Sequence, residues 1–147
     1  MAATYSTAAS SVQPDDVALR RLAWVGPLTI IAAVIGTVIV RTIAAALLNV
    51  GNFPPLGWGP PIAFTVIGAL GAVLVFALIG RFARRPITLF KRIALGVLVV
   101  SFVPDILLLV SRVMPGTTVA TVGALAVMHV LAWTIIVRML TTLAVTE

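Results

Sequence analysis

The chain has 147 residues, of which 61% are hydrophobic and only 10% are charged. A typical soluble domain is about 45–50% apolar and about 25% charged, so this chain lacks the polar groups that cover a soluble globule. The composition predicts an integral membrane protein and disfavours a soluble enzyme or a disordered chain. The net charge is +6, but the basic residues lie at the ends of apolar runs and form no stripe with aromatic residues. They therefore do not indicate nucleic-acid binding.

Four long apolar runs predict an all-α fold, an integral membrane four-helix transmembrane bundle. Residues 1–19 are rich in Ser, Ala and Thr, and we expect them to form a mobile cytoplasmic tail. The transmembrane domain, residues 20–147, should follow. Each of its apolar runs is long enough to cross a hydrocarbon core of about 30 Å. The predicted spans are residues 22–48, 62–80, 93–113 and 119–140.

The three connections between these spans differ in composition. The first, NVGNFPPLGWGPP, contains four prolines and three glycines and is predicted to be non-helical. Its aromatic residues Phe53 and Trp58 are expected at the membrane interface. The second, RFARRPITLFKR, has five basic residues and no acid. The third is the short turn MPGTT, which makes the last two spans antiparallel neighbours.

The distribution of Lys and Arg predicts the orientation, because cytoplasmic loops carry an excess of these residues. Eight lie on one side of the predicted spans, and only Arg41 and Arg112 lie toward the other. We therefore expect both termini in the cytoplasm and a multi-pass protein of the cell inner (plasma) membrane. The basic residues of the second connection are also expected to contact the anionic headgroups of the bilayer. They are Arg81, Arg84, Arg85, Lys91 and Arg92.

Polar residues inside the spans define a possible intramembrane site. A charge at the centre of a transmembrane helix costs about 2.5–3.5 kcal/mol on insertion scales, so Asp105 needs a partner. Ser101, Asp105 and Arg112 fall on one face of the third span. In the first span, Thr37 and Arg41 share a face, whereas Thr29 is about 80° away from Thr37 at 3.6 residues per turn.

The antiparallel arrangement of the last two spans places Asp105 about one turn from His129. Two alternatives for Asp105 remain open. One is a neutral acid that is hydrogen-bonded to His129, which we expect, and the other is an anion paired with Arg112 or Arg41. The two arginines could instead extend to the headgroups. One His and one Asp do not fill a zinc coordination shell, so neither a metal site nor a catalytic set is predicted.

The four spans, the Pro/Gly-rich first connection, the basic second connection and the segment ALAVMHVLAW in the last span are the chain's most characteristic features. Together they resemble an uncharacterised family of small bacterial four-helix membrane proteins, a domain-of-unknown-function family found mostly in actinobacteria and related phyla. The resemblance covers roughly residues 20–145. It implies the four-helix fold and no activity.

Several functions are compatible with this pattern. The first is a non-enzymatic bundle, without a cofactor, that binds a lipid-like ligand or a protein partner; this is the function we expect. The second is a proton-linked carrier or channel that uses Asp105 and His129, in which case a homo-oligomer would enclose more volume. The third is a membrane enzyme that uses the same pair as acid and base on an apolar substrate such as an isoprenoid. A fourth is tetrapyrrole binding through His129.

Overall fold

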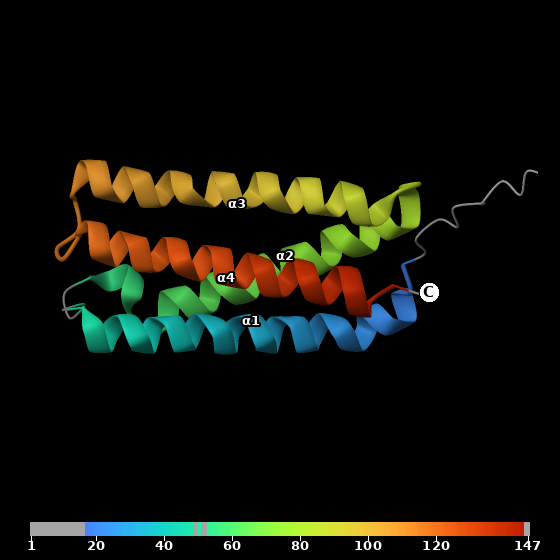
Figure 1. Cartoon of the computed structure of the whole chain (residues 1–147), viewed down its shortest axis with the longest axis horizontal. Coiled ribbons are helices and arrows are strands. Elements are labelled where there is room, and N and C mark those ends of the chain that lie inside the picture. The colour runs from blue at the N-terminus through green and yellow to red at the C-terminus, as the bar shows by residue number, and fades with distance from the viewer. Residues whose placement is uncertain (1–16, 49, 51–52, 146–147) are drawn as a thin grey trace, which may run out of the picture.

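The computed structural model describes residues 17–48, 50 and 53–145. The predicted tail lies outside the described residues as far as residue 16. The described chain forms four α-helices and one short 3-10 turn, η1 (Pro54–Leu56). The α-helices are α1 (Leu19–Leu47), α2 (Gly59–Phe82), α3 (Pro86–Ser111) and α4 (Val119–Leu143) (Figure 1). All four are long and apolar enough to cross a membrane, which confirms the all-α transmembrane bundle.

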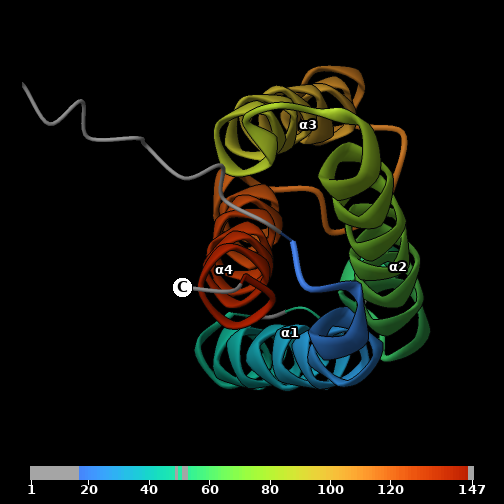
Figure 2. The same ribbon diagram turned by 90° about the vertical axis from the view of Figure 1, so that its right-hand side faces the viewer.

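The helices form an up-and-down bundle. Viewed along its axis, α1 and α3 lie on opposite sides of the bundle, and α2 and α4 lie between them (Figure 2). Consecutive helices run in opposite directions. We call the end where α1 begins and α4 finishes the terminal end, and the opposite one the far end. The connection between α2 and α3 lies at the terminal end, as Figure 1 shows.

The helix bounds differ most from the prediction between α2 and α3. α3 begins at Pro86 rather than near residue 93, so the connection contains only residues 83–85. Proline is well suited to the first position of a helix, where its missing N–H costs nothing. Lys91 and Arg92 do not interrupt the helix, because long basic side chains can extend from a helical backbone toward water.

The first connection folds into the bundle at the far end. Phe53 is only 2% exposed and packs with Leu56 against Val122, Leu125 and Met128. Phe53 therefore belongs to the protein core and does not expose its ring, as an aromatic anchor at the membrane interface would. Both apolar side chains of the connection are buried because they pack against this part of α4. Trp58, in contrast, is 57% exposed, as an interfacial residue would be.

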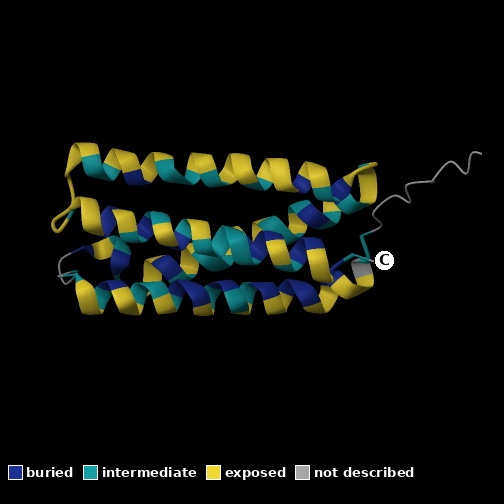
Figure 3. Ribbon diagram, in the orientation of Figure 1, coloured by how far each residue is buried: buried dark blue, intermediate teal, exposed yellow. Residues whose placement is uncertain are grey.

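A second cluster of apolar residues forms the core of the terminal half. The rings of Phe76 on α2 and Phe90 on α3 meet edge to face, with their centres 4.9 Å apart. α1 and α4 approach closely at Gly36, where a Cβ atom would lie 2.8 Å from Cδ1 of Ile135. The outward faces of the helices expose large apolar side chains, most extensively on α3 (Figure 3). Such faces are suited to contact with lipid.

Candidate functional site

A hydrogen bond between Asp105 and His129 connects α3 and α4. Oδ2 of Asp105 lies 3.1 Å from Nδ1 of His129. Asp105 is only 5% exposed, whereas 37% of the His129 side chain is accessible. The structure therefore brings together the two residues that the antiparallel spans placed about one turn apart. Because α3 begins at Pro86, Asp105 lies in the far half of this helix.

The surroundings of His129 leave one of its nitrogens for other chemistry. The ring of Phe102 approaches the imidazole edge to face, with the centres 6.2 Å apart. Asp105 engages Nδ1, so Nε2 is on the other side of the ring. If Nδ1 carries the proton and donates to Asp105, Nε2 is an acceptor and a base; if the acid donates to Nδ1, Nε2 carries a proton and is a donor. The carboxyl group thus sets what the partly exposed imidazole offers.

No arginine takes the place of His129 beside Asp105. Within the described residues, no arginine nitrogen lies within 4.0 Å of the Asp105 carboxylate. Arg112 is exposed and ends α3 in a left-handed conformation, with φ of 49°. It is therefore no longer part of the helix, and the predicted face with Ser101 and Asp105 does not extend to it. The structure therefore does not contain the alternative in which Asp105 pairs with an arginine.

Ser101 lies on the same side of α3 as Asp105 but forms no hydrogen bond with it. Its hydroxyl donates to the backbone carbonyl of Leu98, 2.7 Å away. A serine hydroxyl that bonds to its own helix satisfies itself locally and is a common feature of buried helices. Ser101 therefore lies near the Asp105–His129 pair in sequence without extending its hydrogen bonding.

Thr37 forms a separate polar contact between α1 and α2. Its hydroxyl lies 3.0 Å from the hydroxyl of Thr65. Thr29 was expected to lie off the face of Thr37, yet it is also fully buried, at 0% exposure. The buried stripe of a packed helix is at least about 100° wide, so two residues separated by about 80° fit within it. The hydroxyl of Thr29 makes no hydrogen bond within the described part of the chain.

Arg41 belongs to a third arrangement, at the far end. Its Nε donates to the carbonyl oxygen of Leu56, 3.1 Å away. Its guanidinium carbon lies 3.8 Å from the centre of the Trp58 ring, a cation–π contact. The six predicted intramembrane residues therefore separate into different places rather than forming one site. Of the six, only Asp105 and His129 are hydrogen-bonded to each other.

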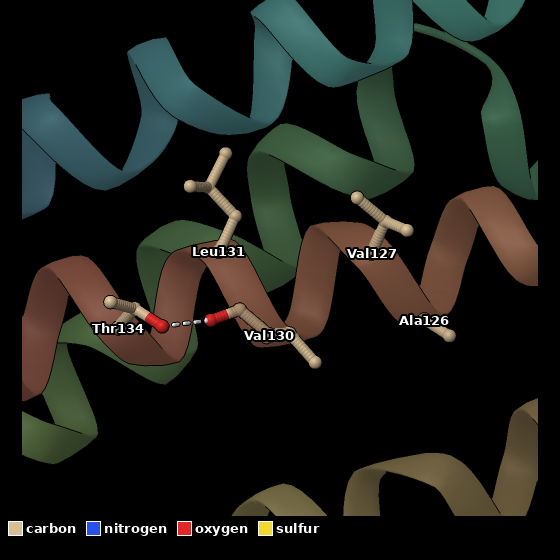
Figure 4. Close-up of a pocket in the computed structure, with 5 residues that line it drawn as sticks. All are labelled: Ala126, Val127, Val130, Leu131 and Thr134. Atoms are coloured by element: carbon tan, nitrogen blue, oxygen red, sulfur yellow. Dashed lines mark hydrogen bonds between the residues drawn. The ribbon is translucent and has the colours of Figure 1, made fainter.

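An open pocket of about 420 Å³ lies along the turns of α4 that also carry His129. Val127 and Leu131 point toward α1, and Val130 points toward α3 (Figure 4). The lining is apolar apart from Thr134, whose hydroxyl donates to the carbonyl of Val130. Because the proton of this hydroxyl is already donated within the helix, the pocket offers contact mainly to an apolar chain. The remaining lining residue is Ala126.

The basic residues of the second connection gather at the terminal end. Arg81 is in the last turn of α2, and Lys91 and Arg92 are in the second turn of α3. All five side chains of the predicted anionic-lipid contact are exposed, including Arg84 and Arg85. Their guanidinium and ammonium groups therefore remain accessible to charges outside the protein. No group of three or more His, Cys, Asp or Glu residues that could hold a metal ion occurs within residues 17–48, 50 and 53–145.

Three neighbours of the candidate residues were not identified from the sequence. Phe102 is three residues before Asp105, and this i, i+3 spacing could have indicated that both residues face α4. Trp58 was interpreted only as an interfacial anchor, and its contact with Arg41 depends on how the first connection folds. Thr65 carries no sequence signal that distinguishes it from the other threonines.

Comparison with known proteins identifies the family but no activity. No curated protein and no solved structure matches this chain. A family profile matches residues 17–145, which include all four helices. This match confirms the predicted resemblance: the chain belongs to the family described as "Family of unknown function (DUF6069)".

Proposed function

We propose that this protein is a non-enzymatic membrane bundle that binds a lipid-like molecule through His129. The observation that carries the proposal is a buried carboxyl group bonded to a partly exposed imidazole. Ionisable residues within transmembrane segments are rare and are often functional. Here Asp105 fixes the ring and leaves Nε2 for a hydroxyl, carbonyl or acid group of the ligand. The apolar part of the ligand would lie against the helix faces, including the pocket on α4.

The terminal end is proposed to face the cytoplasm at the cell inner membrane. Eight of the ten basic residues belong to this end of the bundle or its approach, which fits the positive-inside rule. The five exposed basic residues around the second connection would then meet the negatively charged cytoplasmic leaflet. Each such residue contributes about 1 kcal/mol to attraction by anionic lipids.

Mass spectrometry of the molecules that co-purify with the protein in a mild detergent tests the proposed ligand. We expect one lipid-like species to be enriched over its share in the host membrane. The species should be lost from His129→Leu and retained by Ser101→Ala, because the Ser101 hydroxyl bonds only within its own helix. Co-purifying lipids with the bulk composition, or a profile that is unchanged in His129→Leu, would contradict the proposal.

A proton-linked carrier is the second candidate, since a carboxyl–imidazole pair can pass a proton between its two members. Proton flux into proteoliposomes should then depend on Asp105 and fall strongly in Asp105→Asn, with Ser101→Ala again as the control. Flux at the level of protein-free liposomes would leave ligand binding as the function that the pair supports.

A further inference from the structure

Arg41 is held in a defined orientation at the far end of the bundle. The carbonyl of Leu56 accepts a hydrogen bond from Nε, and the guanidinium carbon lies over the Trp58 ring, 3.8 Å from its centre. The two neighbours come from the first connection, which is anchored in the core through Phe53 and Leu56. An arginine that only extends toward water does not need two fixed neighbours on different sides of its guanidinium group.

The charge of Arg41 has no counter-ion in the described protein. A guanidinium group is always protonated in proteins. The sequence contains a single acidic residue between Val17 and Val145, and this residue, Asp105, is bonded to His129. The structure has no carboxylate within 4.0 Å of Arg41 in its described parts. Because Arg41 is partly buried, an anion beside it would offset the cost of removing the charge from water.

The terminal amino groups of a guanidinium are well placed to bind the oxygens of a phosphate group. Arg41 donates to Leu56 through Nε, and within the described residues its two terminal amino groups, Nη1 and Nη2, have no hydrogen-bond acceptor. Two parallel N–H donors match two oxygens of a phosphate group, which makes a bidentate pair. A stacked, oriented arginine also loses less side-chain entropy on forming these bonds.

The position of Arg41 fits the depth of a lipid headgroup. It lies six residues before Leu47, the last residue of α1, which is about 9 Å along the helix axis. An extended arginine side chain can cover such a distance toward the interface. Trp58 is exposed and directly precedes α2, as expected for an aromatic residue at a membrane–water interface.

We infer that Arg41, held in place by the Leu56 carbonyl and Trp58, forms a binding site for a phosphate group at the far end of the bundle. A phospholipid headgroup and dissolved phosphate share this chemistry, and the location at the end of a spanning helix favours the phospholipid. This site does not include His129, so a negative result for the phosphate site would not contradict the proposed function, and the reverse also holds.

Fluorescence of Trp58 provides a direct measurement, because this ring lies against the guanidinium group that would bind the phosphate. The full chain in a neutral detergent would carry Trp24→Phe and Trp133→Phe, which leave Trp58 as the only tryptophan. The probes are short-chain phosphatidylglycerol, inorganic phosphate and a diacylglycerol of the same chain length that has no phosphate. We expect a saturable change in Trp58 emission with phosphatidylglycerol and none with diacylglycerol.

The probes distinguish the two sources of phosphate. Saturation by phosphatidylglycerol at a much lower concentration than inorganic phosphate identifies a lipid site, and equal saturation by both identifies a site for dissolved phosphate. A response to neither, or the same response to diacylglycerol as to phosphatidylglycerol, would overturn the inference.

Two arginine variants show whether the effect belongs to Arg41. Arg41→Gln should raise the half-maximal concentration at least about tenfold, since a charge-assisted hydrogen-bonding pair is lost. Arg112→Gln is the matched control: it removes the same charge from an exposed arginine at the same end and should change nothing. If Arg41→Gln does not fold, Arg41→Lys keeps the charge without the planar fork and should also weaken binding, by about tenfold. The site would be refuted if the folded Arg41 variant bound phosphatidylglycerol as tightly as the protein with Trp58 as its only tryptophan. Equal weakening by Arg112→Gln would also refute it.

Discussion

The hydrogen bond between Asp105 and His129 can be tested by substituting the two residues one at a time. In Asp105→Asn, the side-chain amide keeps an oxygen and gains an amino group, so it can still bond to Nδ1 of His129. In His129→Leu, the buried carboxyl group loses its observed partner. If Asp105 is a neutral acid, as the sequence led us to expect, His129→Leu should therefore destabilise the bundle more than Asp105→Asn.

The size of the difference follows from the burial of Asp105. Side-chain hydrogen bonds between transmembrane helices average about 0.6 kcal/mol and reach about 1.7 kcal/mol. Asp105→Asn, which retains such a bond, should cost less than about 1 kcal/mol. A buried polar group without a partner costs about 1–3 kcal/mol, and this range applies to His129→Leu because Asp105 is almost inaccessible. The double variant Asp105→Leu/His129→Leu leaves neither group unsatisfied and should recover part of the loss.

Unfolding of the purified protein in mixed micelles, monitored by circular dichroism at neutral pH, measures these free energies. Ser101→Ala is the control and should change the stability little, because the Ser101 hydroxyl bonds to its own helix. A larger loss in Asp105→Asn than in His129→Leu would refute the neutral acid. It would show that the negative charge of Asp105 itself stabilises the bundle.

Four further substitutions test the packing and the orientation. Phe76→Ala should lower the unfolding free energy by about 3–5 kcal/mol, measured in the same micelles, because this ring is fully buried; the exposed Phe64 is the control position. Thr37→Val removes the bond between α1 and α2 and should cost about 0.6 kcal/mol, and at most about 1.7 kcal/mol, in that assay. Cysteines introduced at Ser10 and Gly57 should react with an impermeant reagent from opposite sides of the membrane, and labelling from one side would contradict the proposed orientation.

The fold could be predicted from the sequence because a transmembrane helix needs a long apolar run, and each of the four runs is visible in the hydropathy along the chain. Bounds were less predictable where the sequence changes from apolar to basic. Hydropathy detects the part of a helix that lies in the hydrocarbon, but α3 continues past Lys91 and Arg92 to Pro86. The backbone hydrogen bonds of a helix do not end where its apolar run ends.

The candidate site divides into a part that local geometry determines and a part that it does not. The short connection between α3 and α4 fixes how the two helices meet, so the neighbourhood of Asp105 and His129 could be worked out by counting residues. The contacts of Arg41 depend instead on the path of the first connection, whose residues Phe53 and Leu56 turn back into the core. Nothing in a run of prolines and glycines shows that path in advance.

The uneven burial of α3 gives the Asp105–His129 bond an importance beyond its own free energy. The buried residues of α3 are Pro86 and Phe90 near the terminal end and Asp105 in the far half. Lipid chains are as apolar as the helix faces, so no hydrophobic force holds the rest of α3 against the bundle. In its far half, the bond to His129 is therefore the main polar attachment of α3. If a ligand takes Nε2 of the imidazole, as proposed, it changes what Nδ1 offers to Asp105. Binding at His129 would then act directly on the attachment of the least buried helix.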